Sequence, residues 1–434
     1  PGEDTVEQKF QGGNHLITQI KWTLNRNELR TNLKVVKDSL FVAQKGISVD
    51  GHLYIDKAIR LGATTIICEK LPIRLEANIT FIQVEDSSKT LAIIASNFYD
   101  NPSSKLKLIG VTGTNGKTTV ASLLYQLFKK SGYKTGLLST VQILVDTTVF
   151  NATHTTPDSV TINSYLHQMV LLGVDYCFME VSSHAIHQSR ISGLEFQGAI
   201  FSNISHDHLD YHPTFAEYRD VKKSFFDHLP KSAFALTNID DKNGLVMIQN
   251  TAARKLTYAL KSYADYKAQI LENQLTGLLL KINESEVWVR LIGTFNAYNL
   301  LAIYGTAVEL GLDKLETLRL LSELESVSGR FQFIVSNDKI TAIVDYAHTP
   351  DALVNACAAL QELTPNRLIT VFGCGGDRDS SKRALMGAAA SNGSDFCITT
   401  SDNPRSEKPE AILAQIEKGM AGERYQRIED RMEA

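Results

Sequence analysis

A glycine-rich segment at residues 110–119 (GVTGTNGKTT) contains residue types that can bind phosphate groups. Backbone N–H groups at the start of a helix can surround an anion, and Gly113 and Gly116 let the backbone approach it closely. Lys117 can neutralise phosphate charge, and the Thr118 hydroxyl can ligate Mg²⁺. These residue types in this order predict a phosphate-binding loop.

The setting of this segment supports the prediction, although the pattern is imperfect. An apolar run at residues 108–112 precedes it, and residues 118–130 carry apolar side chains at helical spacing. The strict G-x-x-x-x-G-K-[ST] pattern fails because Val111 occupies the place of its first glycine. The alternative is a glycine-rich turn between a strand and a helix that binds no ligand.

Carboxylate and imidazole groups follow two further apolar runs. Glu180, near the end of the run at 176–181, is well placed to ligate Mg²⁺, which prefers oxygen ligands; the alternative is an exposed strand-end glutamate. The run at 199–203 is followed by His206, Asp207, His208, Asp210 and His212. Histidines at this spacing also fit structural zinc, but no cysteine accompanies them and their neighbours are carboxylates, which favours Mg²⁺.

Other polar residues have ordinary structural interpretations when taken alone. Lys222 is expected, by its own chemistry, to be a solvated helix lysine. Asn238 and Asp241 follow the apolar run at 233–237 and are residue types that commonly cap turns. The DNPR segment at 402–405 is also a common turn composition.

An alternation of strands and helices must position these residues. Around the glycine-rich loop we expect a helix at 118–130 and strands at 108–112, 135–139, 176–181 and 199–203. Before and after this region we expect strands at 39–42, 64–68, 340–344, 367–372 and 396–399, with a helix near 54–61. The alternation predicts an α/β fold with a doubly wound, mostly parallel sheet.

A chain of 434 residues is expected to form several domains. The turn-forming residues 100–104 (DNPSS) and the Gly329-Arg330 pair mark changes in the pattern. We therefore predict three domains: a small α/β N-terminal domain at 1–103, a central phosphate-loop domain at 104–330 and a Rossmann-like C-terminal domain at 331–434.

Composition argues against several classes of protein. Lys plus Arg (44) nearly balances Asp plus Glu (48), so a surface for nucleic acid or anionic membrane is not implied. No apolar run approaches the roughly 20 residues of a membrane span, and the N-terminus lacks a signal pattern. The five cysteines are scattered, odd in number and mostly set in apolar runs, which is typical of reduced thiols in a cytosolic protein.

The loop GTNGKTT resembles the nucleotide loop of the Mur ligase family and of its relatives, the folylpolyglutamate synthetases. Further segments resemble the Mur ligases in the same order, from about residue 34 to the end of the chain. They are TTP at 155–157, MEVSSH at 179–184, NISHDHLDYH at 203–212, NIDD at 238–241, GTFNAYN at 293–299, SGR at 328–330, DYAHTP at 345–350 and DNPR at 402–405. Together these matches are specific to the family.

The resemblance implies that the central domain binds ATP and Mg²⁺. Glu180 and His208 are expected to contact the metal ions, with the Thr118 hydroxyl. Lys222 is expected to be carbamylated and to become a further ligand; Val221 stands where the family's Y-x-x-A-K pattern has alanine. The residues implied to surround the nucleotide are Gly113, Thr114, Asn115, Gly116, Lys117, Thr118, Thr119, Asn238, Asp241, Asn296, Asn299, Arg330 and Asp345.

The DNPR segment resembles that of Mur ligases that add meso-2,6-diaminopimelate, rather than lysine, to UDP-N-acetylmuramoyl-L-alanyl-D-glutamate. Diaminopimelate carries an additional distal carboxylate, which a guanidinium fork binds in bidentate fashion. Arg405 is expected to make this contact, with Arg378 as a second choice. Asp402 and Asn403, next to Pro404, are expected to meet the distal ammonium. The acceptor is expected to contact Thr155, Thr156, Ser182, Gln188 and Arg190.

The implied reaction belongs to peptidoglycan synthesis. ATP phosphorylates the D-glutamate side-chain carboxylate, and the amine of diaminopimelate then displaces phosphate. The C-terminal domain is expected to close on the central domain during this reaction. We expect a monomer in the cytoplasm of a bacterium, with small-molecule partners and no nucleic-acid or membrane partner.

The sequence departs from the family pattern at two elements. The family's D-S-R element, which contacts the uridine diphosphate, aligns with residues 31–33 (TNL), and no counterpart of its G-K-G-H-E element occurs up to Ala434, so an incomplete C-terminal domain is expected. These departures leave an inactive ATP-binding homologue, acting as a regulator or scaffold, as an alternative. The complete set of Lys117, Glu180, His208 and Lys222 argues against it. A folylpolyglutamate synthetase-like ligase is the other alternative, which TTP, MEVSSH and DNPR disfavour.

Overall fold

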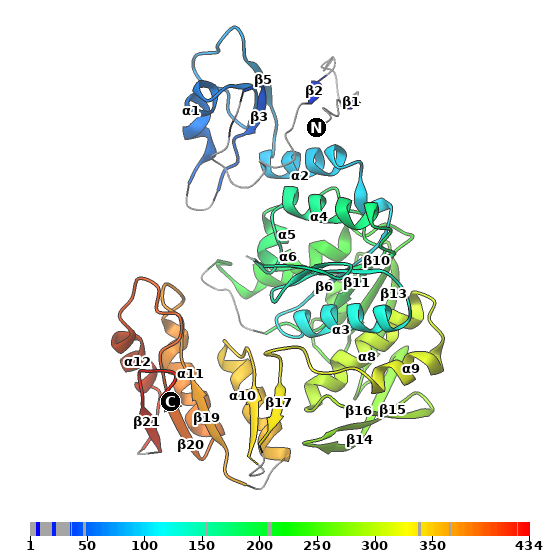
Figure 1. Cartoon of the computed structure of the whole chain (residues 1–434), viewed down its shortest axis with the longest axis vertical. Coiled ribbons are helices and arrows are strands. Elements are labelled where there is room, and N and C mark those ends of the chain that lie inside the picture. The colour runs from blue at the N-terminus through cyan, green and yellow to red at the C-terminus, as the bar shows by residue number, and fades with distance from the viewer. Residues whose placement is uncertain are drawn as a thin grey trace.

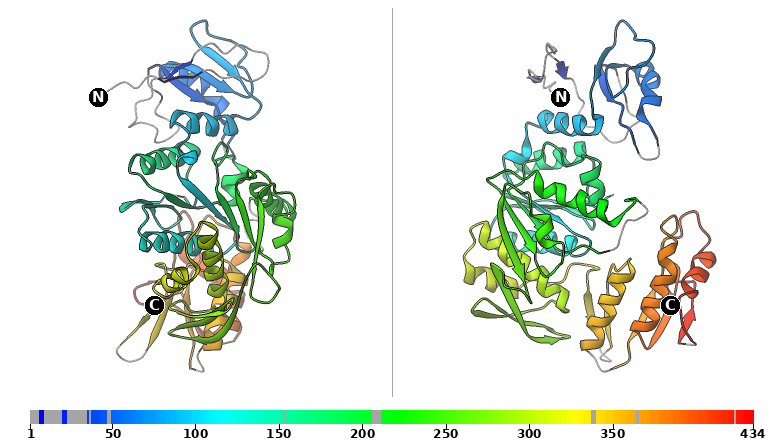
Figure 2. Two further views of the ribbon diagram at one scale, coloured as in Figure 1. Left: turned by 90° about the vertical axis from the view of Figure 1, so that its right-hand side faces the viewer. Right: turned by 180° about the vertical axis from the view of Figure 1, so that it is seen from behind.

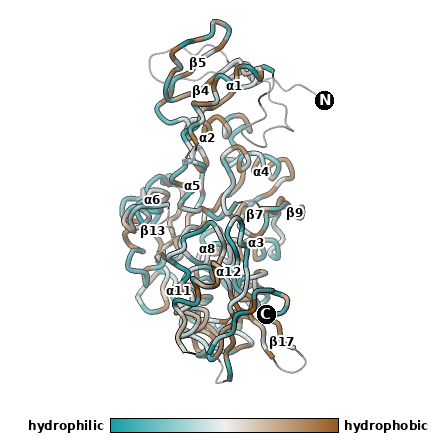
Figure 3. Tube along the Cα trace, turned by 90° about the vertical axis from the view of Figure 1, so that its left-hand side faces the viewer, coloured by the Kyte–Doolittle hydropathy of each residue, from teal (hydrophilic) through white to brown (hydrophobic). Residues whose placement is uncertain are grey.

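The computed structural model describes residues 6–8, 20–22, 35, 37–46, 49–152, 154–205, 211–336, 340–363, 366–422 and 424–434. These residues form three bodies along one long axis, with the largest in the middle (Figure 1). The further views agree that the N-terminal body lies at one end and the C-terminal body toward the other (Figure 2). Hydrophobic stretches occur in all three, so each can bury a core of its own (Figure 3).

The central body is built on one large sheet. Its strand order is β16 (Ser285–Val289), β15 (Gly277–Ile282), β14 (Tyr266–Gln274), β13 (Arg254–Ala259), β12 (Phe234–Asn238), β11 (Gly198–Phe201), β6 (Lys107–Thr112), β10 (Tyr176–Glu180), β7 (Thr135–Leu138), β8 (Ile143–Val145) and β9 (Thr148–Phe150). From β14 to β7 neighbouring strands run parallel, and both edges are antiparallel. The inner strands are buried on both faces, which explains their continuous apolar sequence.

Helices cover both faces of this sheet (Figure 1). One apolar core contains residues of α3 (Lys117–Lys130), α8 (Thr294–Glu309) and α9 (Lys314–Ser322). A second core contains residues of α4 (Ser159–Leu171), α6 (Phe215–Asp227) and α7 (Gly244–Met247), beside the short α5 (Ser183–His187). Thr214 caps α6, since its side chain accepts the Glu217 N–H, and this fixes where the helix begins.

The N-terminal body has a small parallel sheet of β3 (Ser39–Val42), β4 (Ala63–Cys68) and β5 (Thr80–Gln83). The turn η1 (Gly51–Tyr54) and α1 (Ile55–Arg60) connect β3 to β4, and β1 (Val6–Gln8) pairs antiparallel with β2 (Ile20–Trp22). Helix α2 (Ser87–Phe98) and η2 (Pro102–Ser104) lead into the central body. The Ser96 hydroxyl of α2 donates to the Gly193 carbonyl at 3.1 Å, so this helix is attached to the central body.

The C-terminal body has a parallel sheet of β19 (Ile369–Phe372), β20 (Phe396–Thr399) and β21 (Tyr425–Arg427), covered by α10 (Pro350–Leu363), α11 (Ser381–Gly393) and α12 (Pro409–Glu417). A separate hairpin of β17 (Gln332–Val335) and β18 (Thr341–Val344) precedes it. Phe331 packs edge-to-face on Phe295 of α8, with ring centroids 4.9 Å apart. An apolar cluster around this ring pair joins the central and C-terminal bodies.

The predicted fold class is confirmed, since the structure has several α/β bodies and its central body contains a large, mostly parallel sheet. The strand expected at 340–344 exists as β18, but it pairs antiparallel with β17 instead of extending the C-terminal parallel sheet. Local periodicity could not reveal this, because strand direction depends on the partner. The boundaries at 103/104 and 330/331 stay predictions. None of the described helices is long and apolar enough to cross a membrane.

Candidate functional site

The glycine-rich loop connects β6 to the N-terminus of α3, as predicted. Gly113 (φ +152°) and Gly116 (φ +86°) adopt backbone conformations that other residues rarely take. A Cβ at Gly113 would lie 2.0 Å from the Ser202 hydroxyl oxygen, and one at Gly116 would lie 2.6 Å from Asn299 Oδ1. The loop is thus enclosed tightly enough that glycine is required at both positions.

Lys117 folds back over this loop. Its Nζ donates to the carbonyl oxygens of Gly113 (3.0 Å) and Thr114 (2.8 Å). The neighbouring Thr118 is buried, and its hydroxyl accepts a hydrogen bond from Arg330 Nη2 at 3.0 Å. The lysine charge and the N-terminus of α3 therefore face the same small volume, which favours an anion there.

Residues at the end of β11 hold the loop in place, a role that the sequence did not predict. The Asn203 carbonyl accepts the Thr114 N–H at 2.8 Å, and Asn203 Oδ1 accepts the Asn115 N–H at 3.0 Å. The Ser202 hydroxyl donates to the Asn115 carbonyl at 2.5 Å. The available signal was their position directly after an apolar run, at the carboxyl edge of the sheet.

Glu180 lies at the same edge, because β10 pairs in register with β6 and places Glu180 beside Val111. Its side chain is fully buried, so the interpretation as an exposed strand-end glutamate is wrong. Oε1 accepts the Thr140 N–H at 2.7 Å, while no described residue donates a hydrogen bond to the buried Oε2. A buried carboxylate oxygen without a donor is costly unless a cation meets it.

Lys222 projects from α6 into the same region and is only 1% exposed. The interpretation as a solvated helix lysine is therefore wrong. Its Nζ donates to the Gly113 carbonyl at 3.0 Å and lies 4.7 Å from the centre of the Tyr218 ring. The Tyr218 hydroxyl in turn hydrogen-bonds to Thr114 Oγ1 at 3.1 Å. His208 and its neighbours at 206–210 lie outside the described residues.

The residues expected to meet the acceptor gather around Glu180. The Thr156 hydroxyl donates to the Glu180 carbonyl at 2.8 Å and accepts the Ser182 N–H at 3.1 Å. Arg190 Nη1 donates to the Thr156 carbonyl at 2.8 Å, and Arg190 Nε donates to Gln188 Oε1 at 3.0 Å. Burial lowers the pKa of Arg190, but arginine remains charged. Thr155 joins this group, because its hydroxyl accepts a hydrogen bond from that of Thr140 at 3.2 Å.

The polar residues at the end of β12 act largely within the protein. Asn238 Nδ2 donates to the Ser202 carbonyl at 2.9 Å, and the Asp241 carboxylate accepts the N–H groups of Ile204 and Asn243, each at 2.8 Å. These contacts match the capping interpretation of Asn238 and Asp241. They also fix the segment that supports the phosphate loop.

On α8, two asparagines lie beside the loop. Asn296 Nδ2 donates to the Ile292 carbonyl at 2.9 Å, and Asn299 Nδ2 donates to Asn296 Oδ1 at 3.0 Å. Both side chains are buried, and Asn299 Oδ1 faces Gly116. The structure thus brings these predicted site residues to the phosphate loop.

Arg330 and Asp345 lie where the chain passes into the C-terminal body. Besides its hydrogen bond to Thr118, the Arg330 guanidinium lies 4.5 Å from the centre of the Tyr346 ring. Asp345 Oδ2 accepts the Phe331 N–H at 2.8 Å, and Phe331 has a left-handed backbone (φ +52°). A strained residue held by a carboxylate here is consistent with a hinge.

In the C-terminal body, the loops after β19 and β20 lie against each other. The Gly376 N–H donates to the Asn403 carbonyl at 2.9 Å, and a Cβ at Gly376 would lie 1.8 Å from the Pro404 oxygen. Arg405 is left-handed (φ +50°), and its guanidinium donates to the Gly376 carbonyl. Arg378, on the first loop, is exposed.

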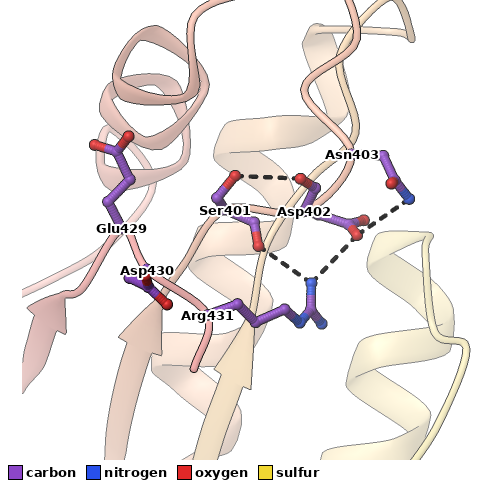
Figure 4. A pocket seen from close by; sticks show the side chains of 6 residues that line it. All are labelled: Ser401, Asp402, Asn403, Glu429, Asp430 and Arg431. Carbon is purple, nitrogen blue, oxygen red and sulfur yellow. Dashed lines mark hydrogen bonds and ion pairs between the residues drawn. The ribbon is translucent and has the colours of Figure 1, made fainter. Parts of the chain in front are cut away.

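A pocket of about 560 Å³ opens beside the DNPR segment, lined by Ser401, Asp402, Asn403, Glu429, Asp430 and Arg431. Figure 4 shows the Arg431 guanidinium turned toward Asp402, with 3.2 Å between Nη1 and Oδ1. Three carboxylates and one guanidinium are therefore the charged groups that line this pocket.

An ion pair beneath these loops, between a buried arginine and a partly exposed glutamate, was not predicted. Arg383 of α11 is 1% exposed and donates through both terminal nitrogens to the carboxylate of Glu407, at 2.8 and 2.7 Å. Glu407 also accepts the Asp377 N–H at 2.6 Å, so the pair clamps one loop to the other. Sequence offered no signal, because an arginine within a helix is usually exposed.

Comparison with known proteins identifies relatives along most of the chain. Models of the Mur ligase family catalytic domain, the Mur ligase middle domain and the Mur ligase glutamate ligase domain match residues 33–99, 111–307 and 329–434. The UDP-N-acetylmuramoyl-L-alanyl-D-glutamate–2,6-diaminopimelate ligase of Cytophaga hutchinsonii is 56% identical over 389 residues, 89% of this chain and 80% of the relative. That of Parabacteroides distasonis is 54% identical over 406 residues, 92% and 84% of the two chains.

Solved structures agree with this result. A structure of a UDP-N-acetylmuramoyl-L-alanyl-D-glutamate–2,6-diaminopimelate ligase shares 32% identity and superposes with a TM-score of 0.68, covering 92% of this chain and 83% of its own. A MurF ligase from Thermotoga maritima in complex with ADP, 21% identical with a TM-score of 0.62, covers 93% and 87% and shows the common fold. The chain belongs to the Mur ligase family.

Proposed function

We propose that this protein is an ATP-dependent ligase that joins meso-2,6-diaminopimelate to UDP-N-acetylmuramoyl-L-alanyl-D-glutamate. The relatives that share more than half of their aligned residues with it carry this name. The observation that supports the proposal best is one of placement. The phosphate loop, the buried Glu180 and the acceptor group around Arg190 all meet at one edge of the central sheet.

ATP is the proposed phosphoryl donor. Within the loop residues Gly113 to Thr119, the backbone N–H groups at the start of α3 would face the triphosphate, and the Lys117 ammonium, held at the loop by two carbonyl groups, would neutralise its charge. The asparagines of α8 and the NIDD segment after β12 flank the proposed nucleotide site, with Arg330 on its C-terminal side. The MurF ligase from Thermotoga maritima, which has the same fold, was solved with ADP.

The residues at this edge fit Mg²⁺. Glu180 Oε2 is a buried carboxylate oxygen that receives no hydrogen bond from the described residues, and such an oxygen suits a hard cation. Thr118, His208 and a carbamylated Lys222 are the other proposed ligands. Mg²⁺ bound there would neutralise negative charge on the phosphates. Carbamylation would replace the buried Lys222 ammonium by an anion.

In the first proposed step, a D-glutamate side-chain carboxylate oxygen attacks the γ-phosphorus of ATP and ADP leaves. Lys117 neutralises charge on the transferred group, and Arg190 and Gln188 orient the acceptor. In the second step, the amine of diaminopimelate attacks the acyl carbon. Phosphate leaves and the amine loses a proton. Activation as an acyl phosphate allows a carboxylate to couple to an amine in water.

The C-terminal loops are proposed to select the amino acid. Arg405, with Arg378, would bind the distal carboxylate that lysine lacks, because a guanidinium fork matches a carboxylate. Asp402 and Asn403, held in place next to Pro404, would bind the distal ammonium. Arg405 now donates to the Gly376 carbonyl, so it must exchange this partner for the substrate.

The remaining assignments follow from this chemistry. We propose that residues 1–103 bind the uridine end of the acceptor, that residues 104–330 bind ATP and that residues 331–434 bind the amino acid. The protein would work as a monomer in the bacterial cytoplasm, where ATP is available. Its five free thiols are consistent with a reducing compartment.

Phosphate release from ATP, measured with the UDP-muramoyl dipeptide and either meso-diaminopimelate or L-lysine, tests the proposal. Release is expected with diaminopimelate and not with lysine. Equal release with both would contradict the amino-acid selection. ATP binding with no release under either condition would favour an inactive ATP-binding homologue.

A further inference from the structure

Tyr211 contacts residues of α5 and of the C-terminal end of this helix. Its hydroxyl accepts a hydrogen bond from Gln188 Nε2 at 3.1 Å and lies 2.9 Å from His187 Nδ1. Its ring packs on that of His184, with the centroids 4.1 Å apart. One side chain, from the segment that precedes α6, therefore contacts three residues of the α5 region.

The direction of the hydrogen bonds that Gln188 makes follows from the chemistry of its partners. Arginine only donates, so Gln188 Oε1 accepts from Arg190 Nε (3.0 Å) and Nη2 (2.6 Å). The Gln188 amide must then turn its Nε2 to the Tyr211 oxygen, which also lies within hydrogen-bond distance of His187 Nδ1. Tyr211 thus fixes the orientation of the amide that holds Arg190.

The other end of Arg190 is fixed as well, since Nη1 donates to the Thr156 carbonyl. Two contacts, Gln188 and Thr156, therefore determine where the guanidinium points. If the Tyr211 hydroxyl were absent, the Gln188 side chain would have one fewer hydrogen bond and could rotate. Arg190 would then lose the rigid support of its Nε and Nη2 groups.

We infer that Tyr211 is a positioning residue for the acceptor: its hydroxyl orients Gln188 and, through it, the Arg190 guanidinium that binds an anionic group of the UDP-muramoyl dipeptide. This inference rests on the proposed function, and it adds a residue that acts through others. The rings of His212 and Tyr218 continue the contact toward the phosphate loop, with Tyr211–His212 and His212–Tyr218 centroids 4.8 and 5.3 Å apart.

The test is Tyr211→Phe, which removes one oxygen and keeps the ring on His184. The Kd and KM for the acceptor are expected to rise about tenfold, because pre-ordering of Arg190 is lost. The kcat and the KM values for ATP and diaminopimelate should stay within about twofold. Calorimetry measures acceptor binding without turnover, and phosphate release measures the kinetic constants.

Tyr125→Phe is the matched control. The Tyr125 hydroxyl also makes two hydrogen bonds, to the Asp146 carbonyl at 2.7 Å and from Lys129 Nζ at 3.3 Å, but it lies on α3 away from the acceptor group. The control should leave the acceptor Kd unchanged. If both variants raised it equally, general loosening would be the cause and the inference would be wrong.

A double-mutant cycle identifies the route of the effect. If Tyr211 acts through Gln188, adding Tyr211→Phe to Gln188→Ala should change the acceptor Kd by less than about twofold. Fully additive effects would overturn the inference and make Tyr211 a direct contact. If Tyr211→Phe left the acceptor Kd unchanged, the inference would be overturned and the proposed function would not. A wild-type protein that bound no acceptor would overturn the proposed function and the inference together.

Discussion

At the scale of single residues, Gly116 tests the phosphate loop most sharply. It is left-handed (φ +86°), and a methyl group there would lie 2.6 Å from Asn299 Oδ1. Gly116→Ala is expected to weaken ATP binding about tenfold or more, because the loop must shift to admit the methyl group. Titration calorimetry with a non-hydrolysable ATP analogue measures this loss.

Gly132→Ala is the control for backbone conformation. Gly132 has nearly the same backbone angle (φ +89°), and a Cβ there would meet no described atom within 4 Å. It should leave the Kd for the ATP analogue unchanged. A similar loss in both variants would mean that backbone strain, and not the fit of the loop, weakens binding.

Glu180 supplies the second prediction at this scale. Glu180→Gln keeps an oxygen for the Thr140 N–H but removes the charge proposed to meet Mg²⁺. The kcat is expected to fall about a hundredfold or more, with a higher Mg²⁺ concentration needed for half-maximal rate. Phosphate release across a Mg²⁺ titration measures both quantities. An unchanged Mg²⁺ requirement would show that Glu180 is not a metal ligand.

At the scale of elements, Asp240 joins β12 to α8 and to the turn after β13. Burial favours a raised pKa for Asp240, but hydrogen bonds from Ser262, Lys261, Leu260 and Tyr298 outweigh it and lower the pKa to about 2. The pKa of an aspartate in the unfolded chain is about 3.9. The ionised Asp240 therefore stabilises the folded state above about pH 4, and this stabilisation is lost as pH falls toward about 2.

Asp240→Asn should lower the melting temperature at pH 7, because the amide is a weaker acceptor for these donors. The difference in melting temperature from the wild type should narrow as pH falls from about 4 to about 2. Calorimetric melting across this range checks the prediction. A constant difference would mean that the charge of Asp240 contributes nothing.

The ion pair between the buried Arg383 and the partly exposed Glu407 gives a prediction for α11 and the loop before α12. Arg383→Met leaves the Glu407 carboxylate without its partner, and the melting temperature is expected to fall by roughly 5–10 °C. Arg319→Met removes an exposed arginine that pairs with Glu316 and Glu323 on α9, and it should have little effect. Equal shifts in the two variants would contradict the structural role of the clamp.

Elements with strong local signals were predictable. The helix expected at 118–130 is α3, and the strand expected at 396–399 is β20, because a helical or apolar pattern is written in adjacent residues. The antiparallel edges β14 to β16 and β8 to β9 were not predicted, and β8 and β9 have only three residues each. Whether such segments form strands depends on the neighbouring strands with which they pair.

In the candidate site, too, local motifs could be predicted from the sequence and tertiary contacts could not. The loop glycines and Lys117 could be predicted from spacing, since the motif is local. The burial of Lys222 could not be, because it depends on α6 packing against a loop more than a hundred residues away. The family resemblance supplied that position. Ser202, Tyr211 and Arg383 were missed because their contacts come from tertiary packing.

At the scale of the whole molecule, the loops after β19 and β20, which we propose to bind the amino acid, and the phosphate loop belong to different bodies (Figure 1). The C-terminal body is joined to the central one through the Phe295–Phe331 contact and Arg330. We expect this joint to close when substrates bind, since the amine must reach the acyl phosphate. Small-angle scattering with an ATP analogue and acceptor should show a smaller radius of gyration. Superimposable profiles would contradict closure.

The most direct test of the central claim follows the oxygen atoms. If ATP activates the D-glutamate side chain, one ¹⁸O from a labelled carboxylate must leave with each phosphate, and the other must stay in the new amide. Mass spectrometry of the phosphate formed in the presence of meso-diaminopimelate measures this transfer. One ¹⁸O per phosphate is the predicted result. Unlabelled phosphate would contradict the acyl-phosphate mechanism and the assignment of this protein as a ligase of this type.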